Sequence, residues 1–164
     1  MGTRWCGSGG GPDGGREGSA VVLRRQVVEG FLAELETVAA GLEGLGPVRA
    51  EDLRGDLQLR WAVERGLLSG LSVVFNVADH ILAGAFGIRA ETYEESLDLL
   101  LARGVVSEGT RRALAGSGGF RNVLVHEYVR VDAGRVAEAL GEAPSTLRSF
   151  VADVRAWLER AGEG

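Results

Sequence analysis

Several residue types are scarce or missing in this chain of 164 residues, and each absence removes a class of protein. The single cysteine, Cys6, excludes an intramolecular disulfide and a metal cluster held by cysteines. Lysine is absent, so all 18 basic residues are arginine, and the 23 acidic residues leave a formal net charge of −5. The chain therefore lacks the broad basic surface of most nucleic-acid-binding proteins, although it has room for a small cationic pocket.

Long apolar runs are also missing. No run approaches the roughly 20 residues of a membrane span, and the N-terminus has no hydrophobic block of the secretory type. We therefore expect a soluble, cytoplasmic protein without a membrane partner. Residues 1–19 contain eight glycines and few apolar residues. Such a segment cannot offset the entropy lost on ordering, so we predict a disordered tail over 1–19 and one folded domain over 20–164.

Strand patterns are nearly absent, because polar residues break the one β-branched run, 123–131. Instead, apolar residues recur at steps of three and four, which is the period of a helix. The first predicted helix has the apolar positions Val28, Phe31, Leu35, Val38, Leu42 and Leu45. We expect Gly44, Gly46 and Pro47 to end this helix.

A second stretch, 57–82, keeps the same rhythm over three heptads. Its apolar positions are Leu57, Trp61, Leu68, Leu71, Phe75, Ala78 and Leu82, while Leu67, Val74 and Ile81 widen the stripe. A period near 3.5 predicts a helix that packs at a shallow angle in a bundle. We expect this helix to be the central one, with Gly84 and Gly87 at its end.

The rest of the chain predicts shorter helices. Thr92 and Glu95 have the spacing of a capping box at the start of a helix that Gly104 ends, and Ser107 caps another. A short segment follows over 135–140, and Pro144 opens a last helix. Its apolar face is Leu147, Phe150, Val151, Val154, Trp157 and Leu158. The chain is predicted to be all-α, an antiparallel helical bundle of four long helices with one or two short ones.

Chemistry-bearing residues gather in the stretch 119–128. Arg121, Asn122, His126 and Tyr128 lie within eight positions, and no other segment combines these side chains. Imidazole transfers protons near neutral pH, and the guanidinium fork matches a phosphate, so the stretch favours chemistry on a phosphodiester. On an ideal helix Asn122 and His126 share a face, whereas Arg121 and His126 lie about 140° apart. One copy therefore does not obviously bring the arginine and the histidine to one atom.

Structural roles are the alternative for each of these residues. His126 can be a hydrogen-bonded helix-end residue, Arg121 a surface ion-pair partner, Asn122 a cap and Tyr128 a half-buried aromatic. The pair Asp79 and His80 has the residue types of an acid–base or metal site, but its place beside the apolar stripe favours a solvated or helix-linking role. Two histidines without clustered acids predict no bound metal, and the glycine-rich tail lacks the lysine of a phosphate-binding loop.

The run from Arg121 through four residues to His126, with Tyr128 two further on, resembles the signature of the HepT toxins of the HEPN superfamily. The surroundings agree with the resemblance, which covers roughly 21–161. They are Ala62-Val63-Glu64-Arg65, Asn76-Val77-Ala78-Asp79-His80-Ile81-Leu82, Tyr93-Glu94-Glu95-Ser96 and Val129-Arg130-Val131-Asp132. The sequence departs from the family at Gly116, Gly118 and Gly119, where apolar residues are expected. Either the motif helix begins afresh at Phe120 or it is locally soft.

The resemblance implies a HEPN-like fold and a metal-independent endoribonuclease, the toxin of a type VII-like toxin–antitoxin pair. It implies a homodimer in which two motifs form one cleft for RNA, with Arg121 and His126 catalytic and Asn122 assisting. It further implies that a nucleotidyltransferase antitoxin silences the toxin by AMPylation of Tyr128. No cofactor and no metal are implied.

Two other functions stay open. A non-catalytic helical module that docks a partner nucleotidyltransferase accounts for the same motif, and the acidic net charge favours it. A nucleotide-binding bundle is the third hypothesis, which a nucleotide-dependent shift in melting temperature would test.

Overall fold

The computed structural model of the chain describes residues 23–126 and 131–162, and every regular element in these ranges is a helix. The predicted tail, 1–19, lies outside the described residues. The helices are α1 (Arg25–Gly44), α2 (Ala50–Gly55), α3 (Leu57–Phe86), α4 (Tyr93–Ala102), α5 (Glu108–Ala113), α6 (Ser117–His126) and α7 (Ala133–Gly162). The prediction of an all-α bundle is confirmed.

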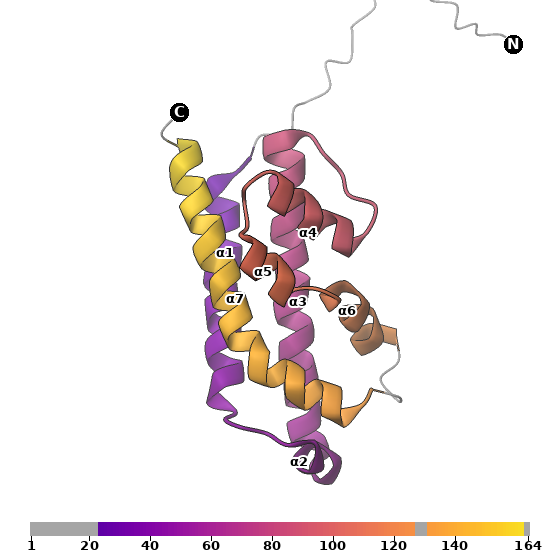
Figure 1. Cartoon of the computed structure of the whole chain (residues 1–164). Helices are drawn as coiled ribbons and strands as arrows, with labels where there is room; N and C mark the ends of the chain where they lie inside the picture. Colours follow the sequence, from indigo (N-terminus) through magenta and orange to yellow (C-terminus); the bar gives the residue numbers. More distant parts are fainter. Residues whose placement is uncertain (1–22, 127–130, 163–164) are drawn as a thin grey trace, which may run out of the picture.

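Three long helices, α1, α3 and α7, lie side by side and form the body of the bundle (Figure 1). The start of α1 lies at the end of α3, because a Cβ on Gly84 would come within 2.9 Å of the Leu23 backbone. The same end of α1 meets the end of α7, where the Arg25 guanidinium donates to the Leu158 carbonyl at 3.2 Å. Helix α1 is therefore antiparallel to both of the other long helices.

Helices α3 and α7 run in the same direction, which differs from a simple antiparallel bundle. Phe86 at the end of α3 packs on Trp157 near the end of α7, with ring centroids 5.9 Å apart. The return leg between them consists of α4, α5 and α6, of ten, six and ten residues, rather than a fourth long helix. Helices α4 and α6 pack on α3, whereas α5 packs on α4 and α7 (Figure 1). The candidate site lies on α6.

The buried face of α3 differs from the predicted stripe. Leu82 and Phe75 are buried, Leu68 is partly buried, and Trp61 is 60% exposed. A heptad repeat drifts by about 20° per seven residues on a straight helix, so the stripe rotates out of the core toward the helix start. Leu67, Val74 and Ile81, which were predicted to widen the stripe, are buried as expected, whereas Val63, Gly70 and Val77 are buried without having been predicted.

The last helix is longer than predicted. The segment 135–140 and the helix expected to open at Pro144 form one continuous helix, α7, with Pro144 in its interior. A proline there removes one backbone hydrogen bond, but the apolar face on both sides of it is buried and holds the two halves together. That buried face includes all six residues predicted for the last helix.

Helix boundaries follow the predicted caps. The Thr92 hydroxyl accepts from the Glu95 N–H at 3.1 Å at the start of α4, and the Ser107 hydroxyl accepts from the Thr110 N–H at 3.2 Å at the start of α5. Gly87 ends α3 in the left-handed region, with φ at 66°. Gly84, which was also expected to end α3, lies inside it and close to the Leu23 backbone.

Within the described ranges, α3 is the one helix whose length and apolar composition would suit a membrane span. It lies at the centre of the bundle, with α1, α4, α6 and α7 packed around it. The core helix of a globular domain has the same composition, so this property is weak support for a membrane location.

Candidate active site

Arg121, Asn122 and His126 lie on α6, which begins directly after a left-handed turn at Gly116, with φ at 76°. The helix therefore does not begin afresh at Phe120, which was one of the two predictions. Gly118 and Gly119 belong to its first turn. Gly118 is buried against α4, and a Cβ added there would lie 2.6 Å from the Tyr93 Cβ. Only glycine permits this close approach of the two helices.

Hydrogen bonds join the first turns of α4 and α6. The Gly118 N–H donates to the Glu94 carboxylate at 3.2 Å, and Arg111 on α5 donates to the other oxygen of the same carboxylate at 3.0 Å. Arg111 also pairs with Asp98 at 2.7 Å. The pKa of the Arg111 guanidinium is raised, chiefly by its hydrogen bond to Asp98. Three short helices thus meet around one carboxylate and hold the motif helix on the bundle.

Arg121 lies over the face of an aromatic ring. Its guanidinium carbon is 5.0 Å from the Tyr93 ring centroid, and that ring stacks on Phe75 of α3 at 4.2 Å. The Arg121 Nε is buried and has no hydrogen-bond partner among the residues that the structure describes. The arginine is therefore fixed by a stack of two rings rather than by a carboxylate within these ranges.

Asn122 and His126 are exposed on α6, one turn apart on the same face. Asn122 lines an open cavity of about 500 Å³ between α3, α4 and α6. The other lining residues are Asp79, Ala90, Glu91, Thr92, Tyr93, Glu94, Gly118 and Gly119. Neither Arg121 nor His126 contributes to this lining, so one copy brings Asn122 and Asp79 to one cavity without the arginine and the histidine of the motif.

Asp79 is exposed at the cavity beside Asn122, whereas His80 is half-buried. Burial raises the pKa of the Asp79 carboxyl above its ordinary value, and the cation of Arg89 opposes this effect. His80 is half-buried, and its Nε2 is buried without a partner in the described part of the chain, so its side chain is less solvated than predicted. No three His, Cys, Asp or Glu side chains within 23–126 and 131–162 cluster as metal ligands.

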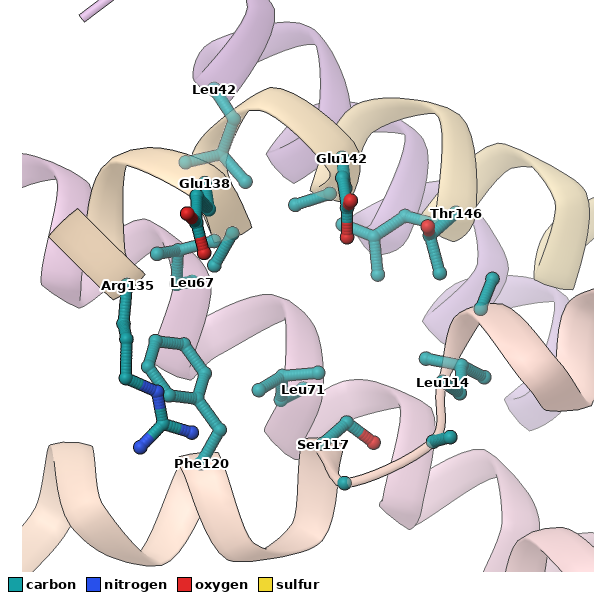
Figure 2. A pocket seen from close by; sticks show the side chains of 16 residues that line it. Leu42, Leu67, Leu71, Leu114, Ser117, Phe120, Arg135, Glu138, Glu142 and Thr146 are labelled. Carbon is teal, nitrogen blue, oxygen red and sulfur yellow. The ribbon is translucent and has the colours of Figure 1, made fainter. Parts of the chain in front are cut away.

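A second cavity, of about 310 Å³, lies between the first turn of α6 and α7 (Figure 2). Leu67, Leu71 and Leu114 form apolar walls, and the carboxylates of Glu138 and Glu142 project from α7. Phe120 and Arg135 lie next to each other in the lining, with the Arg135 guanidinium carbon 5.7 Å from the ring centroid. Arg121, Asn122 and His126 do not line it, so it is distinct from the candidate site.

Tyr128, the predicted site of modification, lies outside the described residues. Tyr93, which is a half-buried residue at the start of α4, was not predicted as part of the site. The resemblance includes the stretch from Tyr93 to Ser96, but the sequence does not place it against α6, because that pairing depends on how α4 and α6 pack on α3 and on each other.

The described chain is a helical bundle that carries an arginine and a histidine five residues apart on one short helix, α6. The sequence profile of the family described as "Ribonuclease HepT-like" matches residues 35–154. The chain therefore belongs to the HepT-like ribonuclease family. No protein of curated function has a sequence that matches the chain.

Solved structures with the same fold include YutE from Bacillus subtilis, described as a cytosolic protein of unknown function. Its TM-score is 0.75 at 18% identity, over 86% of this chain and 94% of YutE. The tri-AMPylated Shewanella oneidensis HEPN toxin, solved in complex with MNT antitoxin, has a TM-score of 0.71 at 16% identity, over 81% of this chain and 99% of the toxin. A toxin–antitoxin structure with AMP-PNP has a TM-score of 0.69 at 15% identity, over 80% of this chain and 99% of the matched chain. At these identities the likeness establishes the fold alone.

Proposed function

We propose that the chain is a metal-independent endoribonuclease, the toxin half of a cytoplasmic toxin–antitoxin pair. The observation that carries the proposal is the arrangement on α6. His126 and Asn122 are exposed on one face of this helix, and Arg121 is fixed beside them over Tyr93. Membership of a ribonuclease family supports RNA as the substrate.

The chemistry follows from the side chains. A neutral imidazole accepts the proton of a ribose 2′-hydroxyl, and the 2′-oxygen then attacks the adjacent phosphorus. An imidazolium donates a proton to the leaving 5′-oxygen, so the products are a 2′,3′-cyclic phosphate and a 5′-hydroxyl. Each proton transfer contributes typically about 10²–10⁴-fold to the rate. Arginine stabilises the charge that develops on the phosphorane oxygens.

Two copies of the chain supply two histidines, one as base and one as acid. Within one copy, Arg121 and His126 point about 140° apart on α6. The stack on Tyr93 also holds Arg121 on the α4 side of the helix. A homodimer that places two α6 helices across a cleft assembles both imidazoles and both guanidinium groups around one phosphate, with Asn122 orienting His126 or the phosphate.

Regulation acts through Tyr128, two residues after His126. A nucleotidyltransferase antitoxin transfers AMP groups to its hydroxyl, and the added negative charge repels RNA from the cleft. The similarity of fold to a tri-AMPylated HEPN toxin in complex with MNT antitoxin supports this part of the proposal.

The test is RNA cleavage by purified protein in EDTA, with the ends of the products identified. His126→Ala is expected to lower the rate by at least about 10²-fold with the helical content unchanged. His80→Ala is the matched control, because it removes the other histidine, on α3, and should leave cleavage intact. Undiminished cleavage by His126→Ala would exclude the mechanism.

A docking module without nuclease activity is the second candidate function. The cavity beside Asn122 is lined by the carboxylates of Asp79, Glu91 and Glu94, and such a lining disfavours RNA. This candidate predicts that unmodified wild-type protein, purified without the antitoxin, cleaves no RNA yet binds the nucleotidyltransferase. Cleavage that His126→Ala abolishes would exclude it.

A further inference from the structure

We infer that Tyr93 is a positioning residue for Arg121, because its ring holds the guanidinium in the orientation that the cleavage reaction needs. The inference rests on the catalytic role proposed for Arg121, and it adds a residue from a different helix to the site. Tyr93 is the first residue of α4, and Arg121 lies in the second turn of α6.

The ring itself cannot move freely. Phe75, on which it stacks at 4.2 Å, is only 2% exposed, and it belongs to the central helix. The stack therefore runs from the core of the bundle through Tyr93 to Arg121. A guanidinium that rests on a fixed ring loses little further freedom when a phosphate binds.

The helices that carry the two residues are also fixed to each other. Gly118 leaves no room between α4 and α6, and the Glu94 carboxylate accepts from the Gly118 N–H. Arg121 follows Gly118 by three residues, which places it one helical turn along and above Tyr93. The position of the guanidinium is thus determined by backbone contacts as well as by the ring.

The partner of the Arg121 guanidinium is an aromatic ring rather than a carboxylate among the described residues. No carboxylate within 23–126 and 131–162 lies within 4.0 Å of the Arg121 guanidinium nitrogens. An aromatic face attracts the cation without neutralising it, so the contact with Tyr93 leaves the guanidinium charge available for a phosphate. Burial of Nε leaves the terminal nitrogens as the groups that can donate to phosphate oxygens.

The experiment compares Tyr93→Leu with Tyr93→Phe in single-turnover and steady-state RNA cleavage. Tyr93→Leu is expected to lower kcat by about tenfold to a hundredfold, since a small misplacement of a charge-stabilising group costs rate, and to change KM by less than about threefold. Tyr93→Phe keeps the ring face and should stay within about threefold of wild type. In an Arg121→Ala background, Tyr93→Leu should cause no further loss.

Phe86→Leu is the matched control, because Phe86 lies under another arginine, Arg103, at 5.1 Å. It removes an equivalent ring from beneath a cation at the far end of α3, where no proposed catalytic residue lies. An equal fall in kcat for Phe86→Leu and Tyr93→Leu, or an equal fall for Tyr93→Phe, would overturn the inference. So would a further loss when Tyr93→Leu is added to Arg121→Ala.

A second measurement does not depend on nuclease activity. Because the Arg121 guanidinium carbon lies over the Tyr93 ring, we expect the nearby δ-methylene protons to show an upfield ring-current shift in the NMR spectrum of the wild type, which Tyr93→Leu abolishes. Absence of that shift in the wild type would overturn the inference even if Tyr93→Leu does not fold. If the wild type cleaves no RNA but shows the shift, the proposed function fails and the placement of Arg121 by Tyr93 stands.

Discussion

The glycines before and within the motif helix have different physical roles at the scale of single residues. Gly116 supplies the left-handed turn that starts α6, and Gly118 permits the contact with Tyr93. A Cβ on Gly119 would meet no atom within 4 Å, and its φ is not positive. The cluster that departs from the family pattern therefore contains two glycines that the fold requires and one that it does not.

Alanine substitutions separate the two kinds of glycine. Gly118→Ala should lower the free energy of unfolding by about 1–3 kcal/mol, because the added methyl forces α4 and α6 apart. Gly119→Ala should raise it by about 0.5–1 kcal/mol, because alanine restricts the unfolded chain and suits a helix. Urea denaturation followed by circular dichroism measures both changes. Equal effects of the two substitutions would contradict the tight contact at Gly118.

The connection between α5 and α7 is a feature of whole elements. Ser107 caps α5, and both its N–H and its hydroxyl donate to the Asp153 carboxylate of α7 at 2.8 Å. Burial alone would raise the pKa of Asp153, but hydrogen bonds from Thr110 and Ser107 outweigh it, so the pKa lies below its usual value. The ionised form of Asp153 therefore stabilises the folded state.

Asp153→Asn should reduce the free energy of unfolding by about 1–2 kcal/mol at pH 7, since hydrogen bonds to a charged group are lost. A lowered folded-state pKa gives stability that is present above the unfolded pKa, about 3.9, and is lost as the pH falls through the folded value. The difference between wild type and variant should therefore shrink below about pH 4. Urea titrations at several pH values measure this dependence.

Glu159→Gln is the control for this prediction. Glu159 is an exposed acid on the same helix and should have little effect at any pH. A difference between wild type and Asp153→Asn that grows as the pH falls from 5 to 3 would contradict the assigned hydrogen bonds.

The arrangement of the whole molecule separates the side chains that we propose to be catalytic. Helix α6 packs on α3 and α4, and its outer face is exposed within the described chain (Figure 1). His126 and Asn122 lie on that exposed face, while Arg121 is held toward α4. The proposed composite site therefore depends on how two copies meet.

Subunit mixing tests this dependence. If each active cleft needs a histidine from both copies, random exchange with a ninefold excess of His126→Ala subunits should lower the activity per wild-type subunit to about one tenth. The measurement is RNA cleavage after the two proteins are refolded together. The same proteins mixed without exchange are the control and should keep full activity per wild-type subunit. Unchanged activity after verified exchange would show that each copy contains a complete site.

The local structure was predictable from the sequence because its causes are local. Caps at Thr92 and Ser107, the left-handed end of α3 at Gly87 and the apolar face of the last helix all depend on neighbouring residues. The motif on α6 was likewise visible as residue types at fixed spacing. The roles of Arg121, Asn122 and His126 remain proposals, and Tyr128 lies beyond the described residues.

Other features of the fold were decided only by the tertiary structure, because they depend on contacts between segments that are distant in the sequence. The rotation of the buried stripe along α3, the continuity of α7 through Pro144 and the parallel course of these two helices follow from packing rather than from propensity. The cation–π contact of Arg121 with the Tyr93 ring is another such contact, between residues 28 positions apart. Periodicity determines that a helix has an apolar face, but the neighbours that cover it determine which residues are buried and where a charged side chain can rest.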